Sequence, residues 1–218
     1  MKNFIIVEGF DMTGKTVVMN ALSSYQAYRS DYSLYDEWFK SRNEAFMLGY
    51  AISDIFKYLN TINEKLPDNI VFNRACGSWY VYSRLYDDQP KPVPIKYVYK
   101  FIDNLLSCGY VVTFIYVRHK SKESAKRIFD YESIRILQRK SSHIEKYDKF
   151  KAFTDYIAKY SEATKLYGEF FKLIESKYLQ DQVKLIKAYT ISSKDGSAID
   201  QVTSVNLELL QFIRDLGK

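Results

Sequence analysis

Cysteine and histidine are scarce in this sequence, and long apolar runs are absent from it. The two cysteines, Cys76 and Cys108, have neither the spacing of zinc ligands nor the density of a disulfide framework. We therefore expect reduced thiols and a cytoplasmic chain. No apolar stretch reaches the length of a membrane span, and none near Met1 is long enough for a signal peptide, so we expect no membrane partner.

Aromatic and basic residues, by contrast, are abundant. Of the 218 residues 20 are tyrosine, 47% are apolar and 27% are charged, which is typical of a globular protein and predicts a single domain over 1–218. The formal net charge of +6 suits an anionic ligand, for which nucleotides and nucleic acid both qualify. The many Tyr, Lys, Ile and Asn residues suggest AT-rich coding, as in a phage, whose product would work in the host cytoplasm, or a low-GC bacterium.

A phosphate-binding motif lies at residues 8–16, which read EGFDMTGKT. It fits G-x-x-x-x-G-K-[ST], in which successive backbone N–H groups surround phosphate oxygens. Gly9 and Gly14 permit backbone angles and a close approach that a side chain would prevent. We expect Lys15 to contact the β- and γ-phosphates and the Thr16 hydroxyl to ligate Mg²⁺. The residues predicted to bind the nucleotide are Gly9, Asp11, Met12, Thr13, Gly14, Lys15, Thr16 and Val17.

Segments that resemble buried strands alternate with amphipathic helices along the chain. Apolar runs predict strands at 4–7, 33–36, 70–72, 110–117 and 183–188, the last at the sheet edge. Helical spacing predicts helices directly after the motif and at 43–59, 95–107, 146–177 and 199–216. This βα alternation predicts an α/β protein with a three-layer P-loop NTPase fold, a five-stranded parallel sheet, helices on both faces and a lid.

An arginine and several aromatic residues follow the predicted strand at 70–72. A guanidinium at the end of a core strand is costly unless an anion meets it, so we interpret Arg74 as a phosphate ligand. A structural ion pair with a nearby carboxylate is the alternative. Tyr82 belongs to an aromatic group that must supply core residues but could also provide a slot for a nucleobase.

Two further segments are candidates for substrate contacts. Glu37 and Trp38 follow the predicted strand at 33–36, where ligands of open α/β sheets bind, although a surface loop explains them equally well. Arg42 stands just before the next predicted helix and completes the predicted substrate-binding set. The basic segment at 118–143 is of the kind that closes over phosphates, and a solvated helix face is its alternative.

Three motifs in order resemble the thymidylate kinase family and its phage deoxynucleotide kinase relatives. EGFDMTGKT is similar to the family's E-G-x-D-x-x-G-K-[ST] loop. NRACGSWYVYSRLY, which contains Arg74, resembles its D-R-x-x-x-S-x-x-x-Y segment. ESAKRI at 123–128 resembles the start of the family's lid, and EKYDKF before a long helix also fits.

The resemblance implies phosphoryl transfer from ATP, with Mg²⁺, to a deoxynucleoside monophosphate, usually dTMP. It also implies a role for each matching residue. Lys15 and Thr16 would hold the ATP phosphates and Mg²⁺, and Asp11 would face the sugar and phosphate of the acceptor. Arg74 would bind the acceptor phosphate, and Arg127 would be the lid arginine. We accordingly predict Lys15, Arg74 and Arg127 as the catalytic residues. We also expect the protein to be a homodimer.

The sequence departs from the family pattern at two positions. Asn73 replaces an acidic residue that usually helps to hold Mg²⁺ through water, which should weaken the metal site unless a nearby carboxylate compensates. Tyr131 stands where the lid normally carries a second arginine, a role that Arg135 or Arg118 could take instead. A nucleotide-binding protein without transfer activity is therefore one alternative.

Other functions also remain open at this point. A deoxynucleoside kinase would share the sheet and the loop and would use Glu37 as the base for a 5′-hydroxyl. A nucleic-acid-binding module using the basic segment is less expected and would show strongly salt-dependent binding. A GTPase is disfavoured because the chain has no N-K-x-D guanine-specificity motif.

Overall fold

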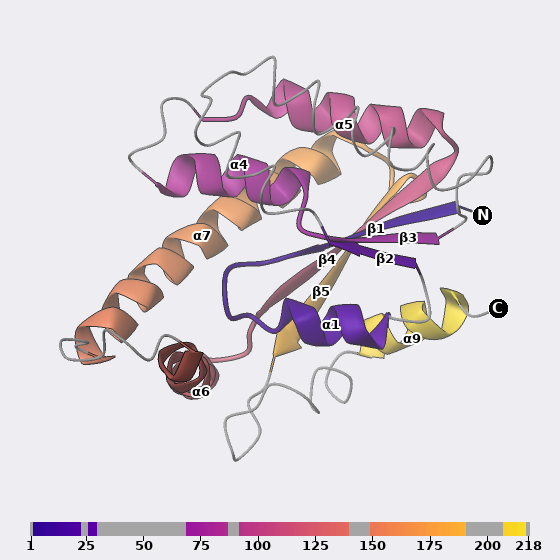
Figure 1. The fold of residues 1–218 in the computed structure, drawn as a ribbon. Coiled ribbons are helices and arrows are strands. Elements are labelled where there is room, and N and C mark those ends of the chain that lie inside the picture. The colour runs from indigo at the N-terminus through magenta and orange to yellow at the C-terminus, as the bar shows by residue number, and fades with distance from the viewer. Residues whose placement is uncertain are drawn as a thin grey trace.

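The computed structural model describes residues 2–22, 26–29, 69–86, 92–139, 149–190 and 207–216. The strand predicted at 33–36 and the helix predicted at 43–59 lie outside these ranges. Within them, the chain forms a parallel sheet covered by helices, as the alternation of apolar patterns predicts (Figure 1).

Among the described residues, the sheet has five strands in the order β2-β3-β1-β4-β5, and every pair of neighbours is parallel. The strands are β1 (Lys2–Glu8), β2 (Gln26–Arg29), β3 (Asn69–Asn73), β4 (Tyr110–His119) and β5 (Val183–Thr190). β5 lies at the edge, as predicted. β1 lies in the middle, so the loop that follows it emerges between the carboxyl ends of β3 and β4.

Helices cover both faces of the sheet (Figure 1). One face carries α4 (Cys76–Leu85), α5 (Ile95–Ser107) and α7 (Lys149–Lys177), which share an aromatic core with the sheet that includes Phe4, Phe101, Phe114 and Phe170. The other face carries α1 (Lys15–Ala21) and α9 (Leu207–Leu216), packed on an aliphatic core that includes Ile5, Val7, Val18 and Leu209. β1 supplies both cores, because its successive side chains alternate between the faces.

Two elements differ from the sequence prediction. β2 at Gln26–Arg29 was missed, because this segment has no apolar run and its pairing with β3 places it in the sheet. The sequence does not predict α4 as a helix, because its aromatic residues do not follow a single helical stripe. The adjacent residues Trp79 and Tyr80 pack in different directions, on Phe101 of α5 and on Phe170 of α7. The helices predicted at 95–107 and near 146–177 are confirmed as α5 and α7.

The predicted lid segment at 118–143 divides into parts of different structure. Its first residues, Arg118 and His119, are the end of β4. α6 (Lys122–Arg139) follows and packs on α7, with the Phe129 ring 5.3 Å from that of Phe153. The described part of the predicted lid is thus the end of a strand followed by a helix, and that helix rests on the amino-terminal half of α7.

Candidate functional site

The phosphate-binding loop joins β1 to α1 with a backbone that needs its glycines. Gly9 and Gly14 have φ angles of 146° and 86°, which side chains disfavour. A Cβ added to Gly9 would lie 2.3 Å from the carbonyl oxygen of Val117, and one on Gly14 would lie 2.8 Å from Cγ2 of Thr190. The glycines therefore let the loop pass tightly against the ends of β4 and β5.

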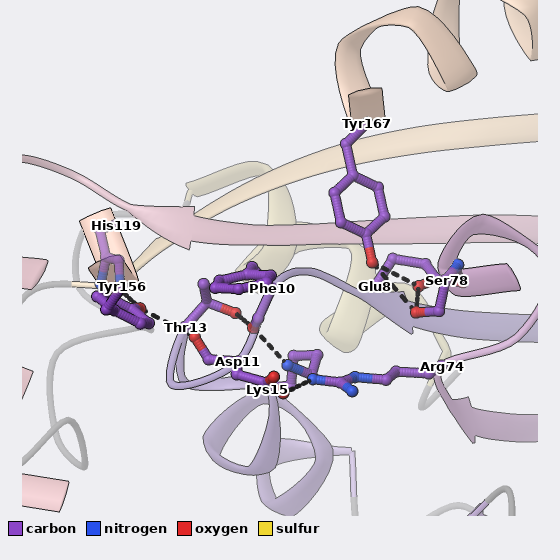
Figure 2. Close-up of polar contacts among 10 residues, drawn as sticks. All are labelled: Glu8, Phe10, Asp11, Thr13, Lys15, Arg74, Ser78, His119, Tyr156 and Tyr167. Carbon is purple, nitrogen blue, oxygen red and sulfur yellow. Dashed lines mark hydrogen bonds and ion pairs between the residues drawn. The ribbon is translucent and has the colours of Figure 1, made fainter. Parts of the chain in front are cut away.

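Lys15 and Thr16 face opposite environments in the first turn of α1. The Lys15 side chain is buried, and its Nζ donates a hydrogen bond of 2.6 Å to the carbonyl oxygen of Phe10 within the loop (Figure 2). Burial and the nearby Arg74 charge lower the pKa of Lys15 well below its usual value, although Asp11 and Glu8 oppose the shift. Thr16 is exposed, so its hydroxyl can reach a ligand outside the loop.

Arg74 reaches back from the end of β3 to the phosphate-binding loop. Its guanidinium pairs with the carboxylate of Asp11 (Figure 2). It also lies over the Tyr82 ring, with Cζ 5.1 Å from the ring centre. The Arg74 side chain is 11% exposed, whereas that of Asp11 is 49% exposed. Burial alone would raise the pKa of Asp11. The positive charges of Arg74 and Lys15, together with the hydrogen bond from Arg74, outweigh burial and lower the pKa.

The aromatic residues of α4 pack on different neighbours within the aromatic core. Trp79 and Tyr80 face the packed interface with α5 and α7, as described above. Tyr82 faces the loop instead, since its ring stacks on Phe10 at 6.0 Å and also contacts Tyr86. Tyr82 is thus a core residue whose ring lies beside Arg74 and the loop, and its contact with a nucleobase stays a prediction.

Glu8 is a site residue that the sequence reasoning treated only as part of the motif. Its carboxylate is fully buried and accepts hydrogen bonds from the backbone N–H groups of Ala75, Gly77 and Ser78 at 3.0, 3.0 and 3.1 Å. The Ser78 hydroxyl donates a further bond of 2.5 Å, and the Tyr167 hydroxyl one of 3.3 Å (Figure 2). Glu8 and the start of α4 are about 70 positions apart, and the one sequence signal for Glu8 is an acidic residue that directly follows the apolar run of β1.

Hydroxyl groups from other elements hold the loop carbonyls. Tyr156 of α7 donates to the carbonyl oxygen of Asp11 at 2.9 Å, and Nε2 of His119 lies 2.8 Å from the Tyr156 hydroxyl (Figure 2). Thr190, at the end of β5, donates to the carbonyl oxygen of Thr13. The two contacts with the loop carbonyls join residues more than 100 positions apart in sequence, and His119 and Tyr156 are 37 positions apart, so no local pattern could have identified them.

The predicted lid arginine is not gathered into this cluster. Arg127 is exposed on α6 and pairs with Glu123 one turn earlier. Arg118, which could replace the second lid arginine, lies over the Tyr189 ring with Cζ 4.6 Å from its centre, and Tyr131 is exposed on α6. Three predicted substrate residues, Glu37, Trp38 and Arg42, lie outside the described residues, as does Arg135's side chain.

The described residues offer a loop that surrounds an ammonium group, not a preformed metal cage. Lys15 Nζ lies inside the loop, where it donates to the carbonyl oxygen of Phe10. Within the part of the chain that the structure describes, no three His, Cys, Asp or Glu residues cluster to hold a metal. Magnesium keeps most of its waters and takes few protein ligands beside phosphates, so a single exposed Thr16 hydroxyl is compatible with it.

The loop between β1 and α1, set at the carboxyl edge of a parallel sheet, defines a phosphate-binding-loop α/β fold. A scan against family models finds no match, and a search of the curated proteins finds none. None of the described helices is long and apolar enough to span a bilayer.

Three solved structures of deoxyadenosine kinase from M. mycoides are similar to this chain. The form with bound dATP has 16% identity and a TM-score of 0.46, covering 99% of this chain and 100% of that one. The form with dCTP has 14% identity and a TM-score of 0.45, covering 98% and 99%. The form with products dCMP and a flexible dCDP has 14% identity and a TM-score of 0.43, covering 99% and 100%. Since these TM-scores are below 0.5, function has to follow from this chain's own residues.

Proposed function

We propose that this protein transfers the γ-phosphoryl group of ATP to a deoxynucleoside monophosphate, with dTMP as the expected acceptor. The observation that carries the proposal is the position of Arg74. It is the largely buried cation that approaches the phosphate-binding loop from the neighbouring strand, through Asp11. On this proposal Arg74 would bind a second phosphate group, beside the loop that would hold the first.

The proposed reaction needs positioning and charge neutralisation more than covalent help from the protein. An oxygen of the acceptor phosphate attacks the γ-phosphorus, the bond from that phosphorus to the β–γ bridging oxygen breaks, and ADP leaves with the bond's electrons. The loop N–H groups and Lys15 would stabilise charge on the β- and γ-phosphates. Arg74 would exchange its contact with Asp11 for the acceptor phosphate, and Asp11 would then be available to the acceptor's sugar.

Magnesium would be held by Thr16 and the phosphates of ATP, and it would neutralise negative charge on the transferring group. Arg127 would have to leave Glu123 to act as the lid arginine. The Glu123 pair is exposed and therefore weak, so this exchange costs little. The homodimer and the substrate contacts of Glu37, Trp38 and Arg42 remain predictions from the sequence.

A second candidate function is phosphorylation of a deoxynucleoside. The observation in its favour is that Asp11 already matches the charge of Arg74, so the described site can accept an uncharged acceptor as well. Glu37 would then serve as the base for the 5′-hydroxyl. A third candidate, nucleotide binding without transfer, is favoured by the neutral Asn73 at the end of β3.

A product screen distinguishes these functions. The protein would be incubated with ATP and Mg²⁺ and, separately, with each of the four deoxynucleoside monophosphates and the four deoxynucleosides, and the products would be separated chromatographically. We expect a diphosphate from at least one monophosphate, and dTDP foremost. Monophosphates formed from deoxynucleosides alone would favour the second function, and ATP binding without any product would favour the third.

A further inference from the structure

The backbone of Arg74 is held in an unfavourable conformation by contacts on both sides. Its φ angle is 68°, in the left-handed region that residues with a side chain seldom adopt. The Arg74 N–H donates to the carbonyl oxygen of Val7 at 2.9 Å, and the next N–H, that of Ala75, donates to Glu8 at 3.0 Å. Val7 and Glu8, which are consecutive residues of β1, thus fix the N–H groups on either side of the Arg74 side chain.

Glu8 also fixes the helix that begins immediately after this point. One carboxylate oxygen, Oε1, receives the N–H groups of Ala75, Gly77 and Ser78, which have no acceptor within a first helical turn. The other, Oε2, receives the hydroxyls of Ser78 and Tyr167. The carboxylate therefore has a donor for each oxygen and cannot move without freeing several buried N–H groups.

The fit of the carboxylate to this helix start is close. A Cβ on Gly77 would lie 2.9 Å from both Cδ and Oε1 of Glu8, which is too close without a shift of the carboxylate. Burying a carboxylate is costly unless its oxygens are hydrogen-bonded, as both oxygens of Glu8 are. An acidic side chain at a fully buried position beside the loop, with a hydrogen-bond donor at each oxygen, thus calls for a purpose other than core packing.

We propose that Glu8 is a positioning residue, whose carboxylate holds the start of α4 so that Arg74 projects onto Asp11 at the phosphate-binding loop. The proposal rests on the proposed function only for the statement that Arg74 then meets the acceptor phosphate. The positioning itself is a property of the free protein. It accounts for the burial of Glu8, its set of backbone donors and the unusual conformation of Arg74 together.

Two variants disturb this arrangement by different means. Glu8→Ala removes the acceptor for three N–H groups, and Glu8→Gln, which retains one acceptor oxygen, is its conservative partner. Gly77→Ala keeps the carboxylate but displaces it, and alanine is the better helix former, so this variant also covers the case in which Glu8→Ala does not fold. Tyr178→Phe is the matched control. It deletes a tyrosine hydroxyl that bonds Tyr99 and Asp103, in contacts that involve neither Glu8 nor Arg74.

The first measurement is the ¹⁵Nε signal of Arg74 in the free protein, assigned by its absence in Arg74→Lys. The second is the KM for dTMP and for ATP, at a temperature where every variant is folded. We expect Glu8→Ala and Gly77→Ala to shift the Arg74 signal and to raise the KM for dTMP about 10-fold or more, with the KM for ATP within about twofold. Glu8→Gln should fall between wild type and Glu8→Ala, and Tyr178→Phe should leave both readouts at wild-type values.

An unchanged Arg74 signal in folded Glu8→Ala and Gly77→Ala would overturn the proposal. So would an equal response in Tyr178→Phe, because lost stability would then explain the effect. A shifted Arg74 signal with no selective change in the KM for dTMP would support the positioning by Glu8 and would count against Arg74 as the acceptor ligand. Failure of the inference and failure of the proposed function are thereby distinguishable.

Discussion

Nε2 of His119 lies 2.8 Å from the hydroxyl oxygen of Tyr156, and that hydroxyl donates its own proton to the carbonyl oxygen of Asp11. The Tyr156 oxygen therefore accepts from His119, which requires a proton on Nε2; in the neutral ring this is the Nε2–H tautomer. Nδ1 of His119 is buried and has no hydrogen-bond partner among the described residues. Protonating Nδ1 would add an unsolvated charge near Lys15.

This contact predicts a pH dependence of stability. Burial, with a smaller contribution from the Lys15 charge, lowers the pKa of His119 from 6.5 to about 4. The unfolded chain therefore binds the proton more readily, and stability that is complete above pH 6.5 is lost as the pH falls towards 4. The contribution lost between pH 7 and pH 5 is about 2 kcal/mol.

Urea unfolding of wild type and His119→Gln at pH 7 and pH 5 measures this contribution. Glutamine keeps an N–H donor for Tyr156 but cannot ionise, so other titrating groups cancel in the comparison. We expect the free energy of unfolding of wild type to fall by about 2 kcal/mol more than that of the variant. Equal losses in the two proteins would show that His119 titrates at an ordinary pKa.

Replacing Arg74 separates the acceptor site from the donor site. Arg74→Ala should raise the KM for the monophosphate acceptor about 10²-fold, because a charge-assisted contact is lost, and change the KM for ATP far less. Steady-state kinetics with each substrate varied in turn measures both values. Equal effects on the two substrates would assign Arg74 to the donor side or to the structural ion pair with Asp11.

Replacing Asn73 tests the metal site. Asn73→Asp should lower the Mg²⁺ concentration that gives half-maximal activity, because hard cations prefer charged oxygen ligands. Repulsion from nearby carboxylates opposes the gain, but the metal itself neutralises that charge. Titrating wild type and variant with Mg²⁺ and measuring activity tests this. An unchanged or weaker dependence on Mg²⁺ would mean that another residue already helps to hold the metal. Asp36 and Glu37 would then be the first residues to replace.

The sequence predicts those parts of the protein whose signals are local. An apolar run or a fixed spacing predicts the loop at 8–16, the strand and helix that flank it, and Arg74 at the end of β3. β2 is not readable, since Gln26–Arg29 owes its place to pairing with β3. The roles of Glu8 and His119 depend on contacts with distant residues such as Tyr167 and Tyr156, which only the folded chain brings together.

The central claim is that ATP phosphorylates a deoxynucleoside monophosphate at the loop containing Lys15. ³¹P NMR of the protein with ATP, Mg²⁺ and dTMP tests it most directly, with Lys15→Ala as the control. We predict that signals of dTDP and ADP appear as those of dTMP and ATP decline, and that Lys15→Ala remains folded but forms no product, because Lys15 stabilises charge in the transition state. Two results would contradict this claim. One is a wild-type protein that leaves the dTMP signal unchanged but converts thymidine to dTMP in a parallel reaction. The other is turnover by Lys15→Ala at the wild-type rate.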